Sequence, residues 1–157
     1  MMAETATFGA GCFWGVEHEF SKVKGVLSTE VGFMGGDAEN PSYQLVCTNT
    51  TGHAEVVHVK YDPKKVPYEK LLEVFWRVHD PTQLNRQGPD VGTQYRSVIF
   101  YYNEEQKKKA EKSLKEEQKK HSKKIATAIV EAEEFYRAEE YHQKYYEKKG
   151  CIENLFK

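Results

Sequence analysis

The chain has 157 residues, of which 39% are hydrophobic and 13% aromatic, and its formal net charge is −1 at pH 7. This length and composition suit one folded domain over residues 1–157, and the charge argues against a nucleic-acid or anionic-membrane partner. No apolar run is long enough to span a membrane, and no basic-then-apolar signal pattern opens the chain, so we expect a cytoplasmic protein.

The first predicted elements are a short strand and a helix. Residues 5–8 predict the strand, and apolar residues then recur at helical spacing: Phe13, Val16, Phe20 and Val23. Gly25 is expected to end this helix. Cys12 therefore falls at a strand-to-helix turn, on the first turn of the helix.

The position of Cys12 suggests a reactive thiol. Free N–H groups and the helix dipole favour an anion at a helix N-terminus, so we expect a lowered pKa for this thiol. Gly11 and Gly15 on either side would allow a sharp turn and a close approach of a ligand. The alternative is a small core cysteine with Phe13 and Trp14 as core aromatics.

The middle of the chain predicts two more strands and two helices. Residues 26–33 and 53–61 have the patterns of strands, with a glycine-containing loop at 34–39 after the first. Asn40 is expected to cap a short helix with Pro41 at its first position. Pro67 opens a second helix with an apolar face.

The second half begins with a long aperiodic loop at 80–94, which indicates a functional segment. Residues 96–102 then predict a strand that is apolar on both faces, and central in its sheet. Residues 103–124 form a Lys- and Glu-rich helix, which we interpret as a solvated face rather than a nucleic-acid patch. A last strand at 126–131 and a last helix at 138–149 complete the pattern. It indicates a two-layer α/β or α+β sandwich of undetermined strand order.

Five short motifs in order give the chain a resemblance to the A-type peptide-methionine sulfoxide reductases. They are Gly11-Cys12-Phe13-Trp14-Gly15, Asn40-Pro41-Ser42-Tyr43, Gly52-His53-Ala54-Glu55-Val56, His79-Asp80-Pro81 and Gly92-Thr93-Gln94-Tyr95-Arg96-Ser97. The resemblance runs from about Phe8 to His142. It implies a ferredoxin-like α+β two-layer sandwich with a mixed sheet and helices packed on it.

The resemblance also implies a set of roles. Cys12 would attack the sulfoxide sulfur, and Glu55 would protonate the oxygen, which requires burial to raise the pKa of its carboxyl. The alternative for Glu55, and the more common situation, is an exposed carboxylate on a strand. Tyr43 and Tyr95 would hydrogen-bond the oxygen, although in a chain with ten Tyr each could be an ordinary core or surface residue.

The remaining implied residues bind substrate. Phe13 and Trp14 would form an apolar wall for the methyl group, and Asp90 would lie near the substrate, with a solvated loop acid as the alternative. His53 belongs to a motif but receives no chemical step. Family members commonly have Tyr where this chain has Phe33, a change at a loop edge that should leave the chemistry intact.

The C-terminus departs more from the family pattern. Many members end in a glycine-rich tail with recycling cysteines, whereas here a short tail from about residue 150 holds one cysteine, Cys151. Gly150 and a mobile chain end would let Cys151 reach Cys12 and resolve its sulfenic acid. Cys47, in a short predicted helix, is interpreted as a buried structural thiol.

These expectations describe a monomeric enzyme that reduces methionine S-sulfoxide, free or in proteins, with thioredoxin or glutaredoxin as reductant. It would need no metal and no organic cofactor. Two alternatives stay open. One is a Cys-dependent hydrolase or acyl transferase that uses Cys12 with His53 or His79. The other is a redox-sensing binding protein in which Cys12 is merely oxidisable.

Overall fold

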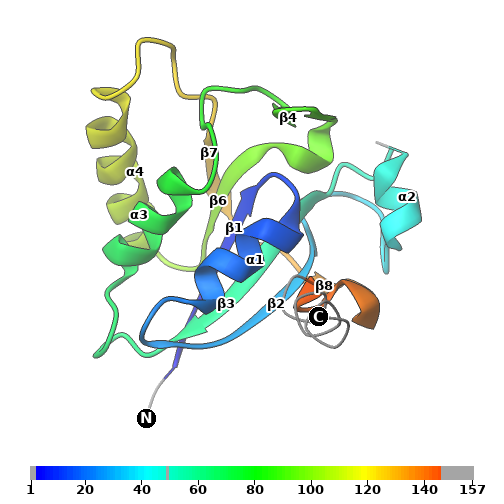
Figure 1. The fold of residues 1–157 in the computed structure, drawn as a ribbon, viewed down its shortest axis with the longest axis horizontal. Helices are drawn as coiled ribbons and strands as arrows, with labels where there is room; N and C mark the ends of the chain where they lie inside the picture. Colours follow the sequence, from blue (N-terminus) through cyan, green and yellow to red (C-terminus); the bar gives the residue numbers. More distant parts are fainter. Residues whose placement is uncertain (1–2, 49, 146–157) are drawn as a thin grey trace, which may run out of the picture.

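The computed structural model describes residues 3–48 and 50–145. In this part of the chain the main sheet has six strands in the order β7-β6-β1-β3-β2-β8 (Figure 1). The pair β6–β7 is parallel and the other pairs are antiparallel, so the sheet is mixed. The strand bounds are β1 Glu4–Ala10, β2 Val26–Met34, β3 Ala54–Tyr61, β6 Ser97–Tyr101, β7 Ala128–Glu131 and β8 Tyr136–Arg137.

Helices pack on one face of this sheet, which confirms the expected α+β architecture. Helix α1 lies against β2 and β3, α3 lies against β1, and α4 packs beside α3 (Figure 1). Helix α4 also links the parallel strands β6 and β7, as a parallel pair requires a crossover connection. The helix bounds are α1 Phe13–Ser21, α2 Tyr43–Cys47, α3 Tyr68–Arg77 and α4 Glu104–Gln118, with 3₁₀ turns η1 Thr93–Tyr95 and η2 Glu140–His142.

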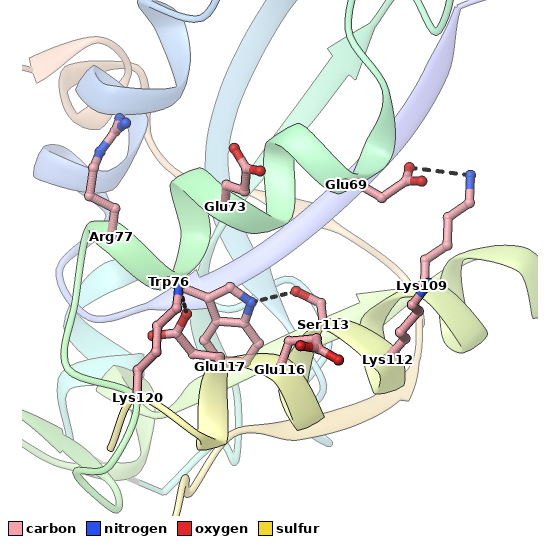
Figure 2. A pocket seen from close by; sticks show the side chains of 10 residues that line it. All are labelled: Glu69, Glu73, Trp76, Arg77, Lys109, Lys112, Ser113, Glu116, Glu117 and Lys120. Atoms are coloured by element: carbon pink, nitrogen blue, oxygen red, sulfur yellow. Dashed lines mark hydrogen bonds and ion pairs between the residues drawn. The ribbon is translucent and has the colours of Figure 1, made fainter.

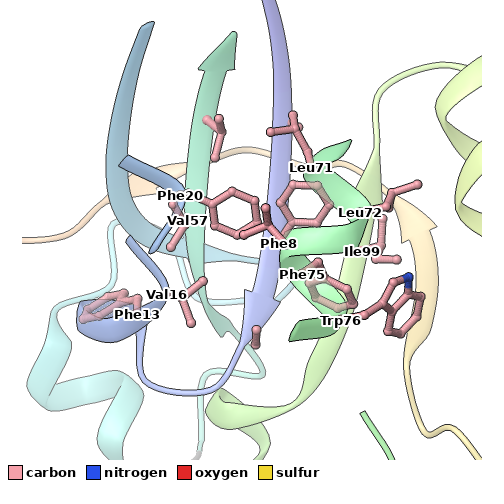
Figure 3. Close-up of a cluster of buried hydrophobic side chains, with 14 of the residues drawn as sticks. Phe8, Phe13, Val16, Phe20, Val57, Leu71, Leu72, Phe75, Trp76 and Ile99 are labelled. Atoms are coloured by element: carbon pink, nitrogen blue, oxygen red, sulfur yellow. The ribbon is translucent and has the colours of Figure 1, made fainter. Parts of the chain in front are cut away.

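The main core lies between the sheet and helices α1 and α3 (Figure 3). The ring of Phe8 on β1 packs between Phe20 of α1 and Phe75 of α3, at centroid distances of 5.1 and 5.4 Å. Leu71 and Leu72 of α3 are fully buried beside them. These residues hold α1 on the sheet, and so fix the position of the turn that carries Cys12.

The opposite face of the sheet has a smaller core. Val98 and Phe100 of β6 belong to it together with Met34 and two residues of β3, and Phe135 of the β7–β8 connection packs against it. Strand β6 therefore buries side chains on both faces, as its sequence predicts. It lies between β7 and β1, one strand from the edge, rather than at the centre of the sheet.

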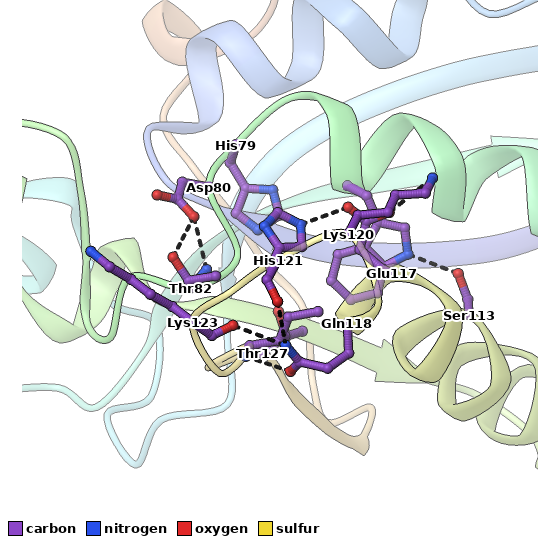
Figure 4. Close-up of polar contacts among 12 residues, drawn as sticks. His79, Asp80, Thr82, Ser113, Glu117, Gln118, Lys120, His121, Lys123 and Thr127 are labelled. Carbon is purple, nitrogen blue, oxygen red and sulfur yellow. Dashed lines mark hydrogen bonds and ion pairs between the residues drawn. The ribbon is translucent and has the colours of Figure 1, made fainter.

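Several element ends differ from the sequence-based expectation. The short helix α2 begins at Tyr43, because Ser42 and not Asn40 is its N-cap: the Ser42 hydroxyl accepts the Leu45 N–H at 3.1 Å. Asn40 has a φ of 47° and lies outside the helix. Helix α4 ends at Gln118, six residues early, because the Gln118 side chain bonds Ile125 N–H and Lys123 C=O and turns the chain back (Figure 4).

The helix predicted at 138–149 is wrong for residues 138–144, which contain the 3₁₀ turn η2 instead, and among the described residues of that range Tyr145 alone is α-helical. The Gln143 side chain explains the difference, because it bonds the backbone of Val31 on β2. Gln143 Oε1 accepts the Val31 N–H at 2.8 Å, and Gln143 Nε2 donates to the Val31 carbonyl at 2.9 Å. The chain is thereby held along β2, and the remaining residues of the predicted helix lie outside the described part.

The aperiodic segment 80–94 contains a small hairpin, formed by β4 Arg86–Gln87 and β5 Asp90–Val91. The hairpin approaches the turn before Cys12 closely. A Cβ at Gly11 would lie 2.8 Å from Cγ of Gln87, and Gly11 has a φ of +99°, so both space and backbone require glycine there. The long loop thus forms one side of the Cys12 region.

A groove with a cavity volume of about 630 Å³ lies between α3 and α4 (Figure 2). Charged side chains line most of it, and Trp76 forms part of its wall while donating to the Ser113 hydroxyl at 2.7 Å. None of the candidate site residues lines this groove. Among the described helices, none is both long and apolar enough to cross a membrane.

Candidate active site

Cys12 lies at the turn between β1 and α1, where the sequence places it, and is the N-cap residue of α1. Its thiol is free and half-buried. Because α1 is packed on the sheet and the hairpin β4–β5 covers Gly11, the thiol is held in a rigid surrounding.

The pKa of this thiol differs from the expectation. The pKa of Cys12 is raised to about 11, mainly by burial and to a smaller extent by the negative charges of Glu55 and Asp90. The N–H groups of Trp14 and Gly15 lower the pKa, as a helix N-terminus should, but their effect is smaller than that of burial. The predicted low pKa is therefore wrong for the free protein, and Cys12 is a thiol at pH 7.

Glu55 lies beside Cys12, at the start of β3. Its side chain is 1% exposed, which rules out the exposed strand carboxylate. Its Oε1 accepts the N–H of Phe13, the residue after Cys12, at 3.3 Å, and its Oε2 has no hydrogen-bond partner in the described part of the chain. Burial raises the pKa of Glu55 to about 8, so the carboxyl is largely protonated at neutral pH.

Three further predicted residues surround the same point. Tyr43 is the first residue of α2, Tyr95 the last of η1, and Asp90 belongs to β5. Burial, followed by the charge of Glu55, raises the pKa of both phenols, that of Tyr95 to about 12. The phenols are therefore neutral donors at pH 7, and Asp90 is near enough for its charge to act on Cys12, Glu55 and Tyr95.

Phe13 and Trp14 form one wall of the site. Phe13 is buried and its ring packs against Phe33 and Tyr43, at centroid distances of 5.8 and 6.1 Å. Trp14 is partly buried and stacks on Tyr145 at 4.0 Å. All seven predicted residues described by the structure thus gather around one point, although they come from five separate segments of the chain.

The sequence analysis missed two residues that support this wall. His142 accepts the indole N–H of Trp14 on its Nδ1 at 3.0 Å. Glu139 accepts the backbone N–H of Tyr43, with its two oxygens at 3.2 and 3.3 Å. The available signal was the family resemblance itself, which extends to His142 without giving that residue a role.

Of the other two cysteines, the structure describes Cys47 and does not describe Cys151. Cys47 is exposed, so its interpretation as a buried structural thiol is wrong: it lies at the end of a five-residue helix whose buried side is Val46. Its side chain interacts with that of Tyr43, which places it at the edge of the candidate site. Cys151, the predicted resolving cysteine, lies outside the described residues.

Neither histidine of the hydrolase alternative is available as a base for Cys12. His53 Nδ1 accepts the Gly36 N–H at 3.0 Å, and its Nε2 bonds the Ala38 carbonyl at 2.6 Å, so this ring ties a loop to the start of β3. His79 bonds the Phe75 carbonyl and the Ser97 hydroxyl, each at 2.7 Å (Figure 4 shows its position). Both rings therefore have structural partners away from the thiol.

Known proteins match this sequence and fold. The profile of the family "Peptide methionine sulfoxide reductase" matches residues 4–154. A peptide methionine sulfoxide reductase from Methanosarcina acetivorans is 59% identical over 156 residues, which cover 98% of this chain and 83% of that protein.

The chain belongs to the peptide methionine sulfoxide reductase family.

Solved structures agree with the family. Mxr1 from Saccharomyces cerevisiae in reduced form is 41% identical, with a TM-score of 0.89 over 93% of this chain and 85% of that one. Mxr1 in complex with Trx2 matches with a TM-score of 0.66 and 29% identity, over 91% of this chain and 84% of that one. The expected fold is confirmed, and a peptide methionine sulfoxide reductase is an oxidoreductase, which excludes the two alternative functions.

In this reductase, no group of three or more His, Cys, Asp or Glu side chains within residues 3–48 and 50–145 is arranged to hold a metal ion.

Proposed function

We propose that this chain reduces methionine S-sulfoxide, free and in oxidised proteins, to methionine, and that residues 1–157 act as one domain with a short tail from about residue 150. The observation that carries the mechanism is the hydrogen bond from Phe13 N–H to the buried Glu55 carboxyl. This contact supports Glu55 as the proton donor, because it holds the carboxyl against the turn that carries Cys12.

The first step transfers oxygen from the substrate to Cys12. The sulfur of Cys12 attacks the sulfoxide sulfur, and Glu55, protonated at neutral pH, gives its proton to the oxygen. The thiol proton leaves as the new bond forms and returns to the carboxylate. The protonated oxygen then passes to the Cys12 sulfur. Its bond to the substrate sulfur and the new sulfur–sulfur bond both break, the substrate sulfur keeps an electron pair and leaves as the sulfide of methionine, and Cys12 remains as a sulfenic acid.

The other residues stabilise and orient the reacting group. Tyr43 and Tyr95 donate hydrogen bonds to the oxygen as negative charge develops on it, which is most effective where water is excluded. Phe13 and Trp14 contact the methyl group through their aromatic surfaces. Asp90 lies near the bound substrate, and its charge adds to burial in raising the pKa of Glu55.

The second stage returns the enzyme to its thiol form. The Cys151 thiol attacks the sulfenic sulfur, releasing water and forming a disulfide with Cys12. Thioredoxin then reduces this disulfide by thiol exchange and is itself oxidised. The complex of Mxr1 with Trx2 supports thioredoxin as the reductant, with glutaredoxin as a second possible one. We further propose that the enzyme is a cytoplasmic monomer without nucleic-acid or membrane partners.

The direct test is methionine formation from methionine S-sulfoxide with dithiothreitol as reductant. Cys12→Ser should abolish it, because a hydroxyl is a far weaker nucleophile than a cysteine sulfur. Cys47→Ser is the matched control and should retain activity with dithiothreitol. Substantial turnover by Cys12→Ser would refute the mechanism.

A second prediction concerns stereochemistry. The aromatic wall holds the methyl group, the donors hold the oxygen and Cys12 approaches from a third direction, so the arrangement fits one configuration of the sulfur. The S epimer should react at least about a hundredfold faster than the R epimer, since a misplaced reacting group loses about that much rate. Separate assays with the two resolved epimers measure this ratio, and equal rates would contradict the arrangement.

A further inference from the structure

A buried histidine lies behind the aromatic wall. His142, at the end of η2, is 1% exposed. Its Nδ1 accepts the Trp14 indole N–H at 3.0 Å, and its ring packs against Phe13 and Tyr43 at centroid distances of 5.5 and 4.2 Å. One side chain therefore contacts three of the residues to which the proposed function assigns a role.

The hydrogen bond defines the state of the imidazole. An indole nitrogen can only donate, so Nδ1 of His142 must be an unprotonated acceptor, and the neutral ring carries its proton on Nε2. That Nε2 is buried and has no partner within the described part of the chain. A phenyl ring would occupy the same place without leaving a buried donor unpaired, so packing alone does not account for a histidine here.

The backbone that carries His142 is fixed independently of Trp14. The next residue, Gln143, is bonded through its amide to Val31 of β2. The N–H of Lys144 donates to the buried carboxyl of Glu17 on α1, at 2.6 Å. The imidazole is thus held by the sheet and by α1, whereas the indole that it contacts is only partly buried. The geometry lets His142 orient Trp14 rather than the reverse.

We propose that His142 is a positioning residue that fixes the orientation of the Trp14 indole and thereby sets the selectivity for a methyl group on the sulfoxide. Its kinetic consequence rests on the proposed function, in which Trp14 contacts that methyl group. Loss of the acceptor releases the indole to rotate, which loosens the wall while the thiol and the carboxyl stay in place.

Two variants separate the acceptor from the ring. His142→Phe keeps an aromatic ring but removes the acceptor, and His142→Asn keeps an acceptor close to the position of Nδ1 in a smaller side chain. His121→Phe is the control, a histidine after α4 that contacts Glu117 at 2.7 Å. Each is assayed with dithiothreitol on methionine S-sulfoxide and on ethionine S-sulfoxide, which is one methylene larger.

His142→Phe should raise KM for methionine S-sulfoxide about tenfold and change kcat by less than about threefold. The expected size follows because one methylene in an apolar pocket changes kcat/KM by about 10- to 200-fold. The ratio of methionine to ethionine efficiency should fall at least about fivefold. His142→Asn should restore most of both quantities, and the control should change neither. A His142→Phe enzyme with unchanged KM and unchanged ratio, whatever its melting temperature, would overturn the proposal.

A double-mutant cycle with Trp14→Phe tests whether His142 acts through the indole N–H, because phenylalanine has no such donor. In the Trp14→Phe background, His142→Phe should have no further effect on the selectivity ratio. Additive effects of the two changes would assign His142 an independent role and overturn the proposal.

A fluorescence measurement tests the same contact without turnover. The chain has two Trp, so Trp76→Phe leaves Trp14 as the only indole fluorophore. In that background His142→Phe should at least about double the acrylamide quenching constant of Trp14, and His142→Asn should return it toward the parent value. Equal quenching in all three folded proteins would refute the positioning role. The quenching measurement does not depend on turnover. If the wild-type enzyme fails to reduce methionine sulfoxide, that failure refutes the proposed function and leaves the positioning role to be decided by the quenching constants.

Discussion

The sulfur of Cys12 and the carboxyl of Glu55 lie in one site where both keep their protons at neutral pH. The pKa of the thiol is about 11 and that of the carboxyl about 8, in each case because burial disfavours the charged form. Each negative charge would also raise the pKa of the other group. In the proposed mechanism, the free enzyme thus holds a protonated carboxyl for the sulfoxide oxygen beside a protonated thiol.

Removal of that acid should slow the first step strongly. Glu55→Gln keeps the shape and the acceptor for Phe13 N–H, and should lower the rate of methionine release by about two to four orders of magnitude. The assay is single turnover without reductant, so that recycling does not enter. A decrease of less than about threefold would transfer the acid role to Tyr43, Tyr95 or water.

The same experiment gives a pH dependence. Because the reacting form holds a proton on Glu55, the wild-type rate constant should be level below pH 7 and fall as pH rises through about 8. Glu55→Gln should lack this decline. A wild-type rate that rises through pH 8 would mean that the Cys12 thiolate, and not the thiol with a protonated Glu55, is the reacting form.

At the residue scale, the sequence predicted which side chains lie together around Cys12, but it did not predict how deeply they are buried. The motifs around Cys12 and Glu55 identified both residues, and local reasoning about a helix N-terminus gave the correct sign for the N–H effect. The burial that outweighs it comes from distant segments, such as the hairpin with Gln87 and the wall with Tyr43. The burial of Glu55 and the exposure of Cys47 likewise depend on contacts that no local pattern contains.

At the scale of elements, His79 joins the end of α3 to two strands. It bonds the Phe75 carbonyl of α3 and the Ser97 hydroxyl of β6, and Ser97 in turn bonds Thr127 before β7 at 2.7 Å. Burial lowers the pKa of His79 to about 4, so the ring is neutral in the folded enzyme. These bonds also fix the start of the loop that carries the hairpin β4–β5.

This junction should make the fold sensitive to acid. The folded pKa of His79 lies below the ordinary value of 6.5, so the unfolded chain takes up the proton first as pH falls. Stability should therefore decrease from about pH 6.5 to about pH 4, by on the order of 2–3 kcal/mol from this residue. Urea unfolding at several pH values measures it, and His79→Gln should flatten this part of the curve. An unchanged curve in His79→Gln would disprove the assignment.

The sequence predicted the long periodic elements well and the short ones poorly. Helices α1 and α3 have the apolar pattern of one buried face, and strands β1, β2, β3 and β6 have apolar runs or alternation, so local sequence defines these elements. The two-residue strands β4, β5 and β8 have no period to detect. Strand β8 forms because residues remote in sequence, such as Gly32 and Arg137, meet in the fold, whereas β4 and β5 pair with each other in a local hairpin.

At the scale of the whole molecule, recycling depends on how the tail meets the site. The described chain ends at Tyr145, which stacks on Trp14 beside the site, and Cys151 is six residues further along. We propose that Cys151 reaches Cys12 from there, since six residues of extended chain span up to about 20 Å. Cys47, exposed and next to Tyr43, is the competing thiol.

Two single variants decide between these thiols. Cys151→Ser should still release about one methionine per enzyme without reductant, because the first step needs only Cys12. It should form no intramolecular disulfide and turn over poorly with thioredoxin, while dithiothreitol restores turnover. Loss of thioredoxin activity in Cys47→Ser instead would make Cys47 the resolving residue. Full activity in both variants would indicate an external thiol such as glutathione.

The amide of Gln143 has one more consequence, for contacts between molecules. Within the described residues, β8 pairs with β2 at Gly32 and Phe33, and the Ala138 N–H donates to the Val31 carbonyl at 2.9 Å, so this margin of β2 has no strand partner from Val31 toward its start. An unpaired margin is a template on which a second chain can add a strand. Gln143 occupies both the N–H and the carbonyl of Val31, the next residue along that margin. The Gln143 side chain thus adds to the backbone of Ala138 at Val31, and leaves fewer free groups on this margin for a second chain to bond.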